Sequence, residues 1–369
     1  MTINRRDVIL TGLLATASAA VLPSRSMAQA VFAPKPGGWR TFDIVTRLEI
    51  DTAGSPAQAW IPVPSMNEPD WLKTVDNSAT SNGRHTLWRD PKYGATLMHA
   101  EWSGSEPKGT IEVKSRIRTR DRAVDLGGPT TGGPLAEDDR KLYTTSTSHI
   151  PLDGIVKEVS DQIVANVKPR TDIKTVAAIY DWIVDKTYRD ANVRGCGTGD
   201  IVAMLKNGNL GGKCADLNAL FVGLVRAQGI PARDIYGIRV APSSFGYKSI
   251  GANSATITKA QHCRADVHLA GYGWVPMDPA DVRKIILEEP PGNLAAGDAR
   301  VIAARQALFG AWETNWMAYN TAEDLMLPNA KAGKAPFLMY PEAETVAGRL
   351  DCLDPETFRY TITSAEVSI

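Results

Sequence analysis

The fold of this chain is decided by residues 207–240, which read NGNLGGKCADLNALFVGLVRAQGIPARDIYGIRV. Apolar residues after the cysteine recur at helical spacing, at Leu217, Leu220, Phe221, Leu224 and Val225. Gly229 and the Ile-Pro pair that follows it are typical of a helix end. A helix is therefore predicted to begin near Cys214, directly after two glycines, and a strand with the sequence DIYGIRV is predicted to follow it.

A second block, residues 261–281, reads QHCRADVHLAGYGWVPMDPAD and predicts a strand hairpin around a Gly-Tyr-Gly turn. Strand alternation places four polar side chains on one face: His262, Arg264, Asp266 and His268. The other face is apolar and includes Cys263, which we therefore expect to be structural. The hairpin brings Asp278 back towards His262. Counting from the turn puts Asp278 close to Asp266, so an offset of one or two residues, or a bulge, is needed to reach His262.

Cys214 has the surroundings that a nucleophilic thiol requires. The thiolate is the reactive form, and the unpaired N–H groups and positive dipole end of a helix N-terminus stabilise it. The same N–H groups can stabilise an oxyanion on an acyl substrate. Gly211 and Gly212 would let a substrate backbone pass close to the sulfur. The alternative, which the position alone leaves open, is a small buried side chain at the start of a core helix.

The chain has five histidines, so the search for a base is short. We interpret His85, His99 and His149 as surface or packing residues of the N-terminal part and the linker region. His262 is the predicted base, and Asp278 is the group that would fix its tautomer. The alternative role of Asp278 is to cap the turn that follows it. The four cysteines show no zinc-ligand spacing, and we expect no metal and no cofactor.

Three separated blocks between residues 151 and 280 resemble the transglutaminase-like superfamily. The resemblance implies a nucleophile at Cys214, a general base at His262 and an orienting aspartate at Asp278. It also implies an α+β fold with a papain-like core, in which helices pack on an antiparallel sheet. The family often has Trp and Glu where this chain has Arg264 and Asp266. We expect these two residues to line the substrate groove together with the two glycines.

Two residues near the glycines are candidates for supporting an oxyanion hole. Tyr188, which ends the preceding helix, resembles a family position with that role, and a core tyrosine is the alternative interpretation. Asn209, like Asn207, is a weaker candidate, and a polar turn residue is the alternative there.

The remaining sequence predicts two further parts around a core of residues 146–285. Residues 31–145 contain alternating strands separated by turn signals, which favours a β-rich, sandwich-like N-terminal domain. Residues 286–369 contain a tryptophan-rich segment and a final strand, and we expect them to pack on the core or on the N-terminal domain.

Residues 1–30 have the layout of an export signal. Arg5 and Arg6 precede a moderately apolar stretch, and Ala28 and Ala30 offer small residues for cleavage. The paired arginines favour the twin-arginine route, so we expect a periplasmic or secreted protein. An uncleaved membrane anchor is the alternative, but the apolar stretch is shorter than the roughly 20 residues that cross a bilayer.

The composition excludes several classes of protein. The chain has 369 residues, of which 43% are hydrophobic, with 41 Lys plus Arg against 41 Asp plus Glu. This balance disfavours a nucleic-acid partner, which needs an excess of positive charge. No long apolar run beyond the N-terminus predicts a membrane span. A chain of this size needs no disulfide framework, and if one disulfide forms we expect it between Cys196 and Cys352.

The expected chemistry is attack of Cys214 on the amide carbonyl of a peptide, protein or other amide, followed by resolution of a thioester. The resemblance favours a cysteine peptidase or amidase. One alternative is a transglutaminase that cross-links Gln to amines. The other is a non-catalytic protein that binds an envelope polymer through Trp60 and Trp71, although such tryptophans are more often core residues.

Overall fold

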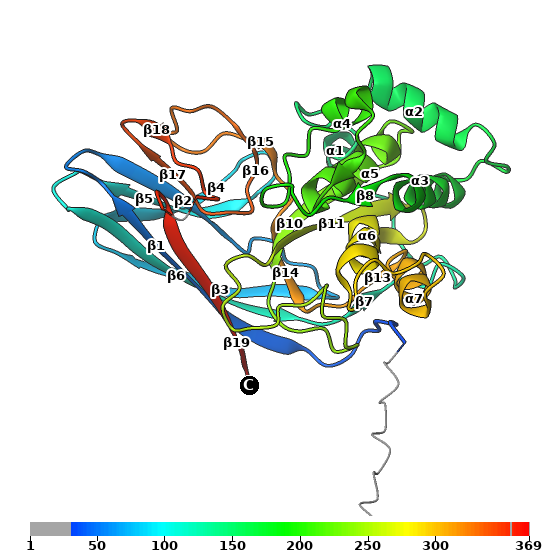
Figure 1. Cartoon of the computed structure of the whole chain (residues 1–369), viewed down its shortest axis with the longest axis horizontal. Helices are drawn as coiled ribbons and strands as arrows, with labels where there is room; N and C mark the ends of the chain where they lie inside the picture. Colours follow the sequence, from blue (N-terminus) through cyan, green and yellow to red (C-terminus); the bar gives the residue numbers. More distant parts are fainter. Residues whose placement is uncertain (1–30, 355, 369) are drawn as a thin grey trace, which may run out of the picture.

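The structure, a computed structural model, describes residues 31–354 and 356–368 (Figure 1). The export signal expected in residues 1–30 lies outside the described residues. Among the helices of the described part, none has both the length and the apolar character needed to cross a membrane.

Two antiparallel sheets, on the left of Figure 1, pack against each other as a sandwich. The first has the order β19 (Arg359–Val367), β1 (Arg40–Asp51), β6 (Lys108–Thr119) and β3 (Leu72–Ser81). The second has the order β18 (Gly348–Arg349), β17 (Glu342–Thr345), β2 (Ala57–Val63), β5 (Thr96–Trp102) and β4 (Arg84–Arg89). Every second residue of β6 is buried, and Ile111 and Val113 face Ile61 and Met98 of the other sheet. The predicted β-rich N-terminal region is confirmed.

A third antiparallel sheet carries the site. Its order is β12 (Gly273–Met277), β11 (Gln261–Leu269), β10 (Ala232–Arg239) and β14 (Trp316–Asn320). Helix α5 (Cys214–Arg226) packs on β10 and β11, and all of its residues are buried. Its apolar stripe therefore serves as the centre of the core, as its sequence predicts, and the α+β class is confirmed.

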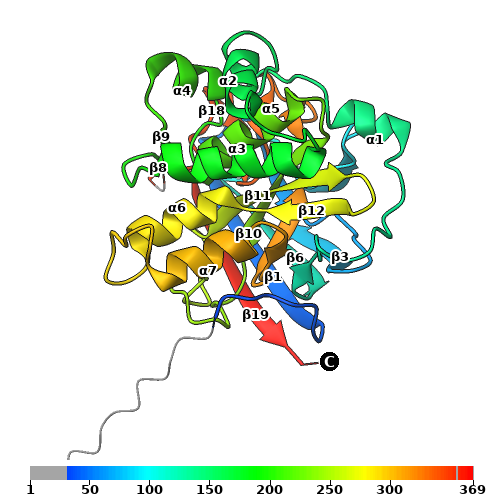
Figure 2. The ribbon, with the colours of Figure 1, turned by 90° about the vertical axis from the view of Figure 1, so that its right-hand side faces the viewer.

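The other helices surround α5 and the edge of this sheet (Figure 2). They are α1 (Glu137–Leu142), α2 (Gly154–Val164), α3 (Asp172–Lys186), α4 (Ile201–Asn207), α6 (Pro279–Glu288) and α7 (Ala299–Ala307). Helix α3 contacts α2, α5 and α6, and it buries Val176, Tyr180 and Ile183. The Thr171 hydroxyl caps α3 by accepting the N–H of Lys174.

Three pairs of short strands complete the fold. They are β7 (Arg122–Ala123) with β13 (Ala311–Trp312), β15 (Glu323–Leu325) with β16 (Ala335–Phe337), and the parallel pair β8 (Tyr188–Arg189) with β9 (Gly211–Gly212). The last pair fixes the chain immediately before α5.

The C-terminal part contributes strands to all three large sheets. Strand β14 pairs with β10 in the core sheet, whereas β17 pairs with β2 and β19 pairs with β1 in the sandwich. These pairings join the sandwich to the helical core, and both therefore depend on residues near the end of the chain.

Candidate active site

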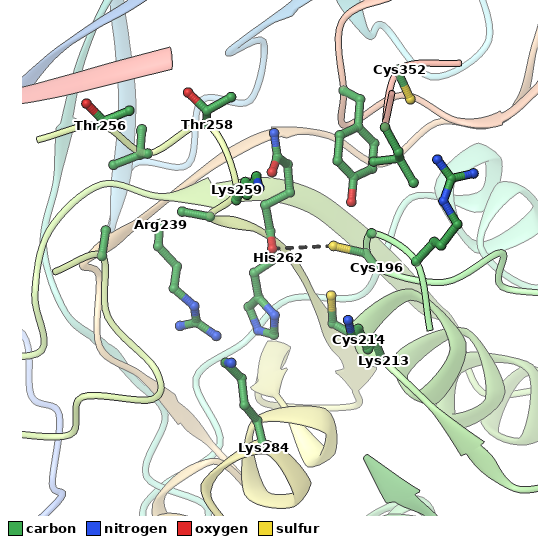
Figure 3. A pocket seen from close by; sticks show the side chains of 18 of the residues that line it. Cys196, Lys213, Cys214, Arg239, Thr256, Thr258, Lys259, His262, Lys284 and Cys352 are labelled. Carbon is green, nitrogen blue, oxygen red and sulfur yellow. Dashed lines mark hydrogen bonds between the residues drawn. The ribbon is translucent and has the colours of Figure 1, made fainter. Parts of the chain in front are cut away.

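A cavity of about 640 Å³ lies where the start of α5 meets β11, and both Cys214 and His262 line it. Figure 3 shows Cys214 and Cys196 on one side of the His262 ring, with Arg239 and Lys284 pointing towards the ring from the other side.

Cys214 is the first residue of α5 because the chain before it is fixed by hydrogen bonds. The carboxylate of Asp216 accepts the backbone N–H groups of Lys213 (3.0 Å), Thr198 (2.9 Å) and Gly199 (3.0 Å). The N–H of Ala215 donates to the carbonyl of Cys196 at 2.9 Å. The loop that contains Cys196 is thereby held against the helix start.

The residue Cys214 is 97% buried, yet the surroundings of its thiol favour the thiolate. Hydrogen bonding from Cys196 and then from Cys263 lowers the pKa of Cys214 well below its usual value, and His262 adds to this against the opposing effect of burial. The same contact with Cys214, together with burial, raises the pKa of Cys196. Because Cys214 is also the sulfur at the positive end of α5, a negative charge in this group of three sulfurs is favoured there.

His262 faces two carboxylates through the same ring nitrogen. Its Nε2 lies 2.8 Å from Oδ2 of Asp278 and 3.4 Å from Oδ1 of Asp281. Burial and Arg239 lower the pKa of His262, but Asp281 and Asp278 outweigh them and leave that pKa raised. Because Nε2 is engaged by carboxylates, Nδ1 is the ring nitrogen left for the thiol. This arrangement favours an imidazolium beside a thiolate.

Asp278 makes the contacts that both of its predicted roles require. Its Oδ1 accepts the N–H of Asp281 at 3.1 Å as the N-cap of α6, while Oδ2 faces His262. In the hairpin, Ala265 pairs with Met277, so continuing the register puts Asp278 opposite Arg264, two residues from His262. The predicted offset is therefore present. Burial and the charge of Asp281 raise the pKa of Asp278.

Two residues of this site, Asp281 and Asn218, were not predicted from the sequence. Asp281 is fully buried, and although burial alone would raise its pKa, Arg239, His262 and Arg264 hold that pKa below its usual value. Asn218, one turn after Cys214 on α5, donates to Asp278 Oδ1 at 3.3 Å. The DPAD spacing, which puts two aspartates three residues apart at a helix start, was the available signal for Asp281.

A cation would find three potential ligand atoms here, because those of His262, Asp278 and Asp281 lie within 4.8 Å of one another. However, Arg239 lies 2.5 Å from the Asp281 carboxylate and Arg264 lies 3.3 Å from that of Asp278. The two guanidinium groups already neutralise these carboxylates, which disfavours a bound metal ion.

The expectation that Arg264 and Asp266 line the substrate groove is wrong. Both are almost fully buried, and neither lines the cavity. The Arg264 guanidinium lies 4.9 Å from the ring centre of Trp316, and the Asp266 carboxylate binds Arg233 at 2.8 Å and Arg122 at 3.1 Å. Their face of β11 is covered by chain segments distant in sequence.

The two glycines before Cys214 also do not line the cavity. A Cβ at Gly212 would lie 2.6 Å from the Cβ of Asp216, and one at Gly211 would lie 2.4 Å from the ring of Tyr188. Glycine is therefore required for packing at these positions, rather than for passage of a substrate as we expected.

Tyr188 and Asn209, the candidates for oxyanion support, contact each other. The hydroxyl of Tyr188 donates to Asn209 Oδ1 at 2.7 Å, and the side chain of Tyr188 is 45% exposed, which rules out a core tyrosine. Neither residue lines the cavity.

The four cysteines, all within the described residues, are free thiols, so the expected disulfide between Cys196 and Cys352 is absent. The sulfur of Cys196 also lies 3.4 Å from the carbonyl oxygen of Gln261, which is an alternative acceptor for its single proton. Cys263 is fully buried, as predicted, but its neighbours include Cys214 itself.

Trp60 and Trp71 are buried, which removes the binding surface on which the non-catalytic alternative relied. Trp60 stacks on His99, and Trp71 packs against Trp312 and Trp316.

Comparisons with known proteins agree with this architecture. The family model described as the transglutaminase-like superfamily matches residues 157–279. An uncharacterized protein of Haemophilus influenzae is 36% identical over 344 residues, which cover 89% of this chain and 90% of that protein.

One solved structure resembles the fold at low sequence identity, and a second is a weaker match. A candidate cysteine protease from Cytophaga hutchinsonii has a TM-score of 0.50 and 15% identity, covering 90% of this chain and 99% of its own. Red sea bream transglutaminase has a TM-score of 0.29 and 12% identity, covering 84% of this chain and 57% of its own.

Proposed function

This chain belongs to the transglutaminase-like superfamily, and from that premise we propose that it is a cysteine peptidase or amidase with Cys214 as nucleophile, His262 as acid and base, and Asp278 as orienting group. The observation that supports this most is the arrangement at the cavity wall. A thiol with a lowered pKa begins a helix beside a histidine whose pKa is raised by two carboxylates.

The proposed reaction begins with the thiolate of Cys214. Its Sγ attacks the carbonyl carbon of the amide, the imidazolium of His262 gives its proton to the leaving nitrogen, and the C–N bond breaks to leave a thioester. A water molecule then gives a proton to His262 and attacks the thioester carbonyl. The products are a carboxylic acid and the free thiolate beside a protonated ring.

The backbone N–H of Cys214 is the oxyanion donor that we propose. The N–H groups on either side of it are occupied, since Lys213 donates to Asp216 and Ala215 donates to the carbonyl of Cys196. The N–H of Cys214 therefore remains for a developing oxyanion at the positive end of α5. Tyr188 and Asn209 are not needed for this role.

We also propose that the protein acts in the periplasm or outside the cell. The paired arginines and apolar stretch of residues 1–30 support export. The test is fractionation of cells that express the full chain, with Arg5 and Arg6 replaced by Lys as a variant that should remain in the cytoplasm.

Incubating the chain without residues 1–30 with peptide and amide libraries, with and without a primary amine, tests the reaction class. We expect amide cleavage and a thioester on Cys214 that mass spectrometry detects after acid quench. The Cys214→Ser variant should form no thioester. Incorporation of the amine in place of water would establish transamidation, and cleavage that persists in Cys214→Ser would contradict the proposal.

A further inference from the structure

The cavity beside Cys214 is strongly cationic in a chain that has no net charge. Six of its lining residues are basic: Arg189, Arg194, Lys213, Arg239, Lys259 and Lys284. Among the described residues that line it there is no Asp or Glu. Such a concentration of one sign in a concave site raises the local concentration of ligands of the opposite sign.

Several of these cations lack a full complement of negative charge. Arg189 and Lys284 share the single carboxylate of Glu288. Lys213 and Lys259 take part in none of the ion pairs formed within residues 31–354 and 356–368. Only two of the six are fully paired, since Arg194 binds Asp351 at 2.8 Å and Arg239 binds Asp281 at 2.5 Å. About three positive charges therefore remain for a ligand.

Lys284 is a largely buried member of this group of cations. It projects from α6 towards His262 and Arg239 (Figure 3), and only 17% of its side chain is exposed. Burial and the nearby charges of Arg189 and Arg239 lower its pKa, although Glu288 opposes them. An anion in the cavity would relieve this crowding of like charges.

An unused hydrogen-bond donor lines the same cavity. Gln261, which precedes His262 on β11, lines the cavity and is 91% buried, and its Nε2 has no hydrogen-bond partner. A buried amide without a partner is costly, so a ligand oxygen that accepts from it would be stabilising. The cations and this amide would both be stabilised by the same kind of ligand atom, an oxygen acceptor that carries negative charge.

We propose that the substrate is an acidic peptide or amide, with a carboxylate close to the bond that Cys214 attacks. In this proposal the cations of the cavity, Lys284 on one side of His262 and Lys213 beside Cys214, attract that carboxylate, and the Gln261 amide donates to a substrate oxygen. This inference rests on the proposed acyl-transfer function and adds the substrate class to it. Either an Asp or Glu side chain or a free chain terminus supplies the same carboxylate chemistry.

Alkylation by iodoacetate and by iodoacetamide tests the proposal without a known substrate. Both reagents attack the same thiolate, so the ratio of their rates at Cys214 cancels the reactivity of the sulfur and reports the charge of the cavity. We expect iodoacetate to be favoured relative to a free thiol. Lys284→Gln should lower the ratio about three- to ten-fold, and raising the salt concentration should lower it too.

Lys186→Gln is the matched control, because Lys186 is an exposed residue of α3 outside the cavity and its loss should leave the ratio unchanged. If Lys284→Gln fails to fold, the salt dependence of the wild-type ratio decides. A ratio equal to that of a free thiol, insensitive to salt and to Lys284→Gln, would overturn the proposal while fast iodoacetamide labelling still supported the proposed function. Slow labelling by both reagents would instead refute the function itself.

Cleavage assays with four matched peptides then identify the source of the carboxylate. Matched peptides carry Glu or Gln beside the scissile bond, each with a free or amidated C-terminus. Preference for Glu assigns a side chain, and preference for the free terminus assigns an exopeptidase-like site. Equal cleavage of all four peptides would contradict the proposal.

Discussion

Replacing Asp278 by Asn would remove a negative charge from beside His262 with little change in shape. Asn is as good an N-cap as Asp, so the start of α6 should be retained. If the amide oxygen keeps the N-cap, the amide NH₂ faces Nε2, 2.8 Å away. That donor would favour the tautomer with the proton on Nδ1, which cannot accept a proton from the thiol.

The size of the effect follows from the distances. Two unit charges separated by 2.8 Å interact by about 6 kcal/mol at an effective dielectric constant of about 20. Only part of this is lost, because burial and Asp281 raise the pKa of Asp278, and Asp281 remains 3.4 Å from Nε2. An opposite charge at such distances generally changes a pKa by about 1 to 3, so the thiolate–imidazolium pair should become about 10- to 1,000-fold rarer.

The assay is the rate of Cys214 alkylation by iodoacetamide between pH 4 and 9. In Asp278→Asn we expect the rate below pH 7 to fall at least ten-fold and the profile to move to higher pH. Asp351→Asn, which alters an exposed carboxylate near the cavity, is the control and should match the wild type. A folded Asp278→Asn protein with the wild-type profile would refute the role assigned to this carboxylate.

Three further outcomes test the fold and its response to pH. Arg226→Met should lower the free energy of unfolding in urea by about 3–5 kcal/mol, because it leaves the Glu323 carboxylate buried without the guanidinium that lies 2.9 Å away. The double variant that also carries Glu323→Met should recover most of that loss. Gly212→Ala should lower the free energy of unfolding by about 1–3 kcal/mol, because its Cβ would overlap the side chain of Asp216 at the start of α5. Gly297→Ala is the control and should leave the stability unchanged, because there is open space around its Cβ. Burial raises the pKa of Glu342 to about 7, so the folded protein keeps a proton that the unfolded chain releases above its usual pKa of 4.5, and the free energy of unfolding should fall as pH rises from 4.5 to about 7. At pH 8 the Glu342→Gln variant should be about 2 kcal/mol more stable than the wild type. Equal stability of the wild type at pH 5 and pH 8 would contradict this.

Local patterns were sufficient to predict the centre of the fold. The helix that begins at Cys214 has its apolar stripe, its glycine turn and its Ile-Pro stop within one continuous stretch. The hairpin of β11 and β12 likewise has its alternation and its turn in adjacent residues. These elements could be found because the interactions that define them lie close together in sequence.

Features that depend on distant segments could not be predicted in this way. Alternation assigned Arg264 and Asp266 to a polar face, and a polar face usually meets solvent or substrate. In the structure all of β11 is buried, because Trp312, Trp316 and Arg122 from remote segments cover that face.

The cationic lining of the cavity is another long-range property. Its basic residues come from β8, the loop between β8 and α4, the turn before α5, the end of β10, the loop before β11, and α6. No window of the sequence shows them together, and the balanced total charge conceals them.

The proposed chemistry requires Cys214 to be a thiolate that is paired with His262. This requirement is tested by measuring the rate at which iodoacetamide labels each of the four cysteines at pH 5.5. The two proteins compared are the chain without residues 1–30 and its His262→Ala variant. We expect Cys214 to be labelled far faster than the other three cysteines, and we expect His262→Ala to remove this advantage. Slow, uniform labelling of all four thiols, or fast labelling of Cys214 that survives His262→Ala in a folded protein, would contradict it.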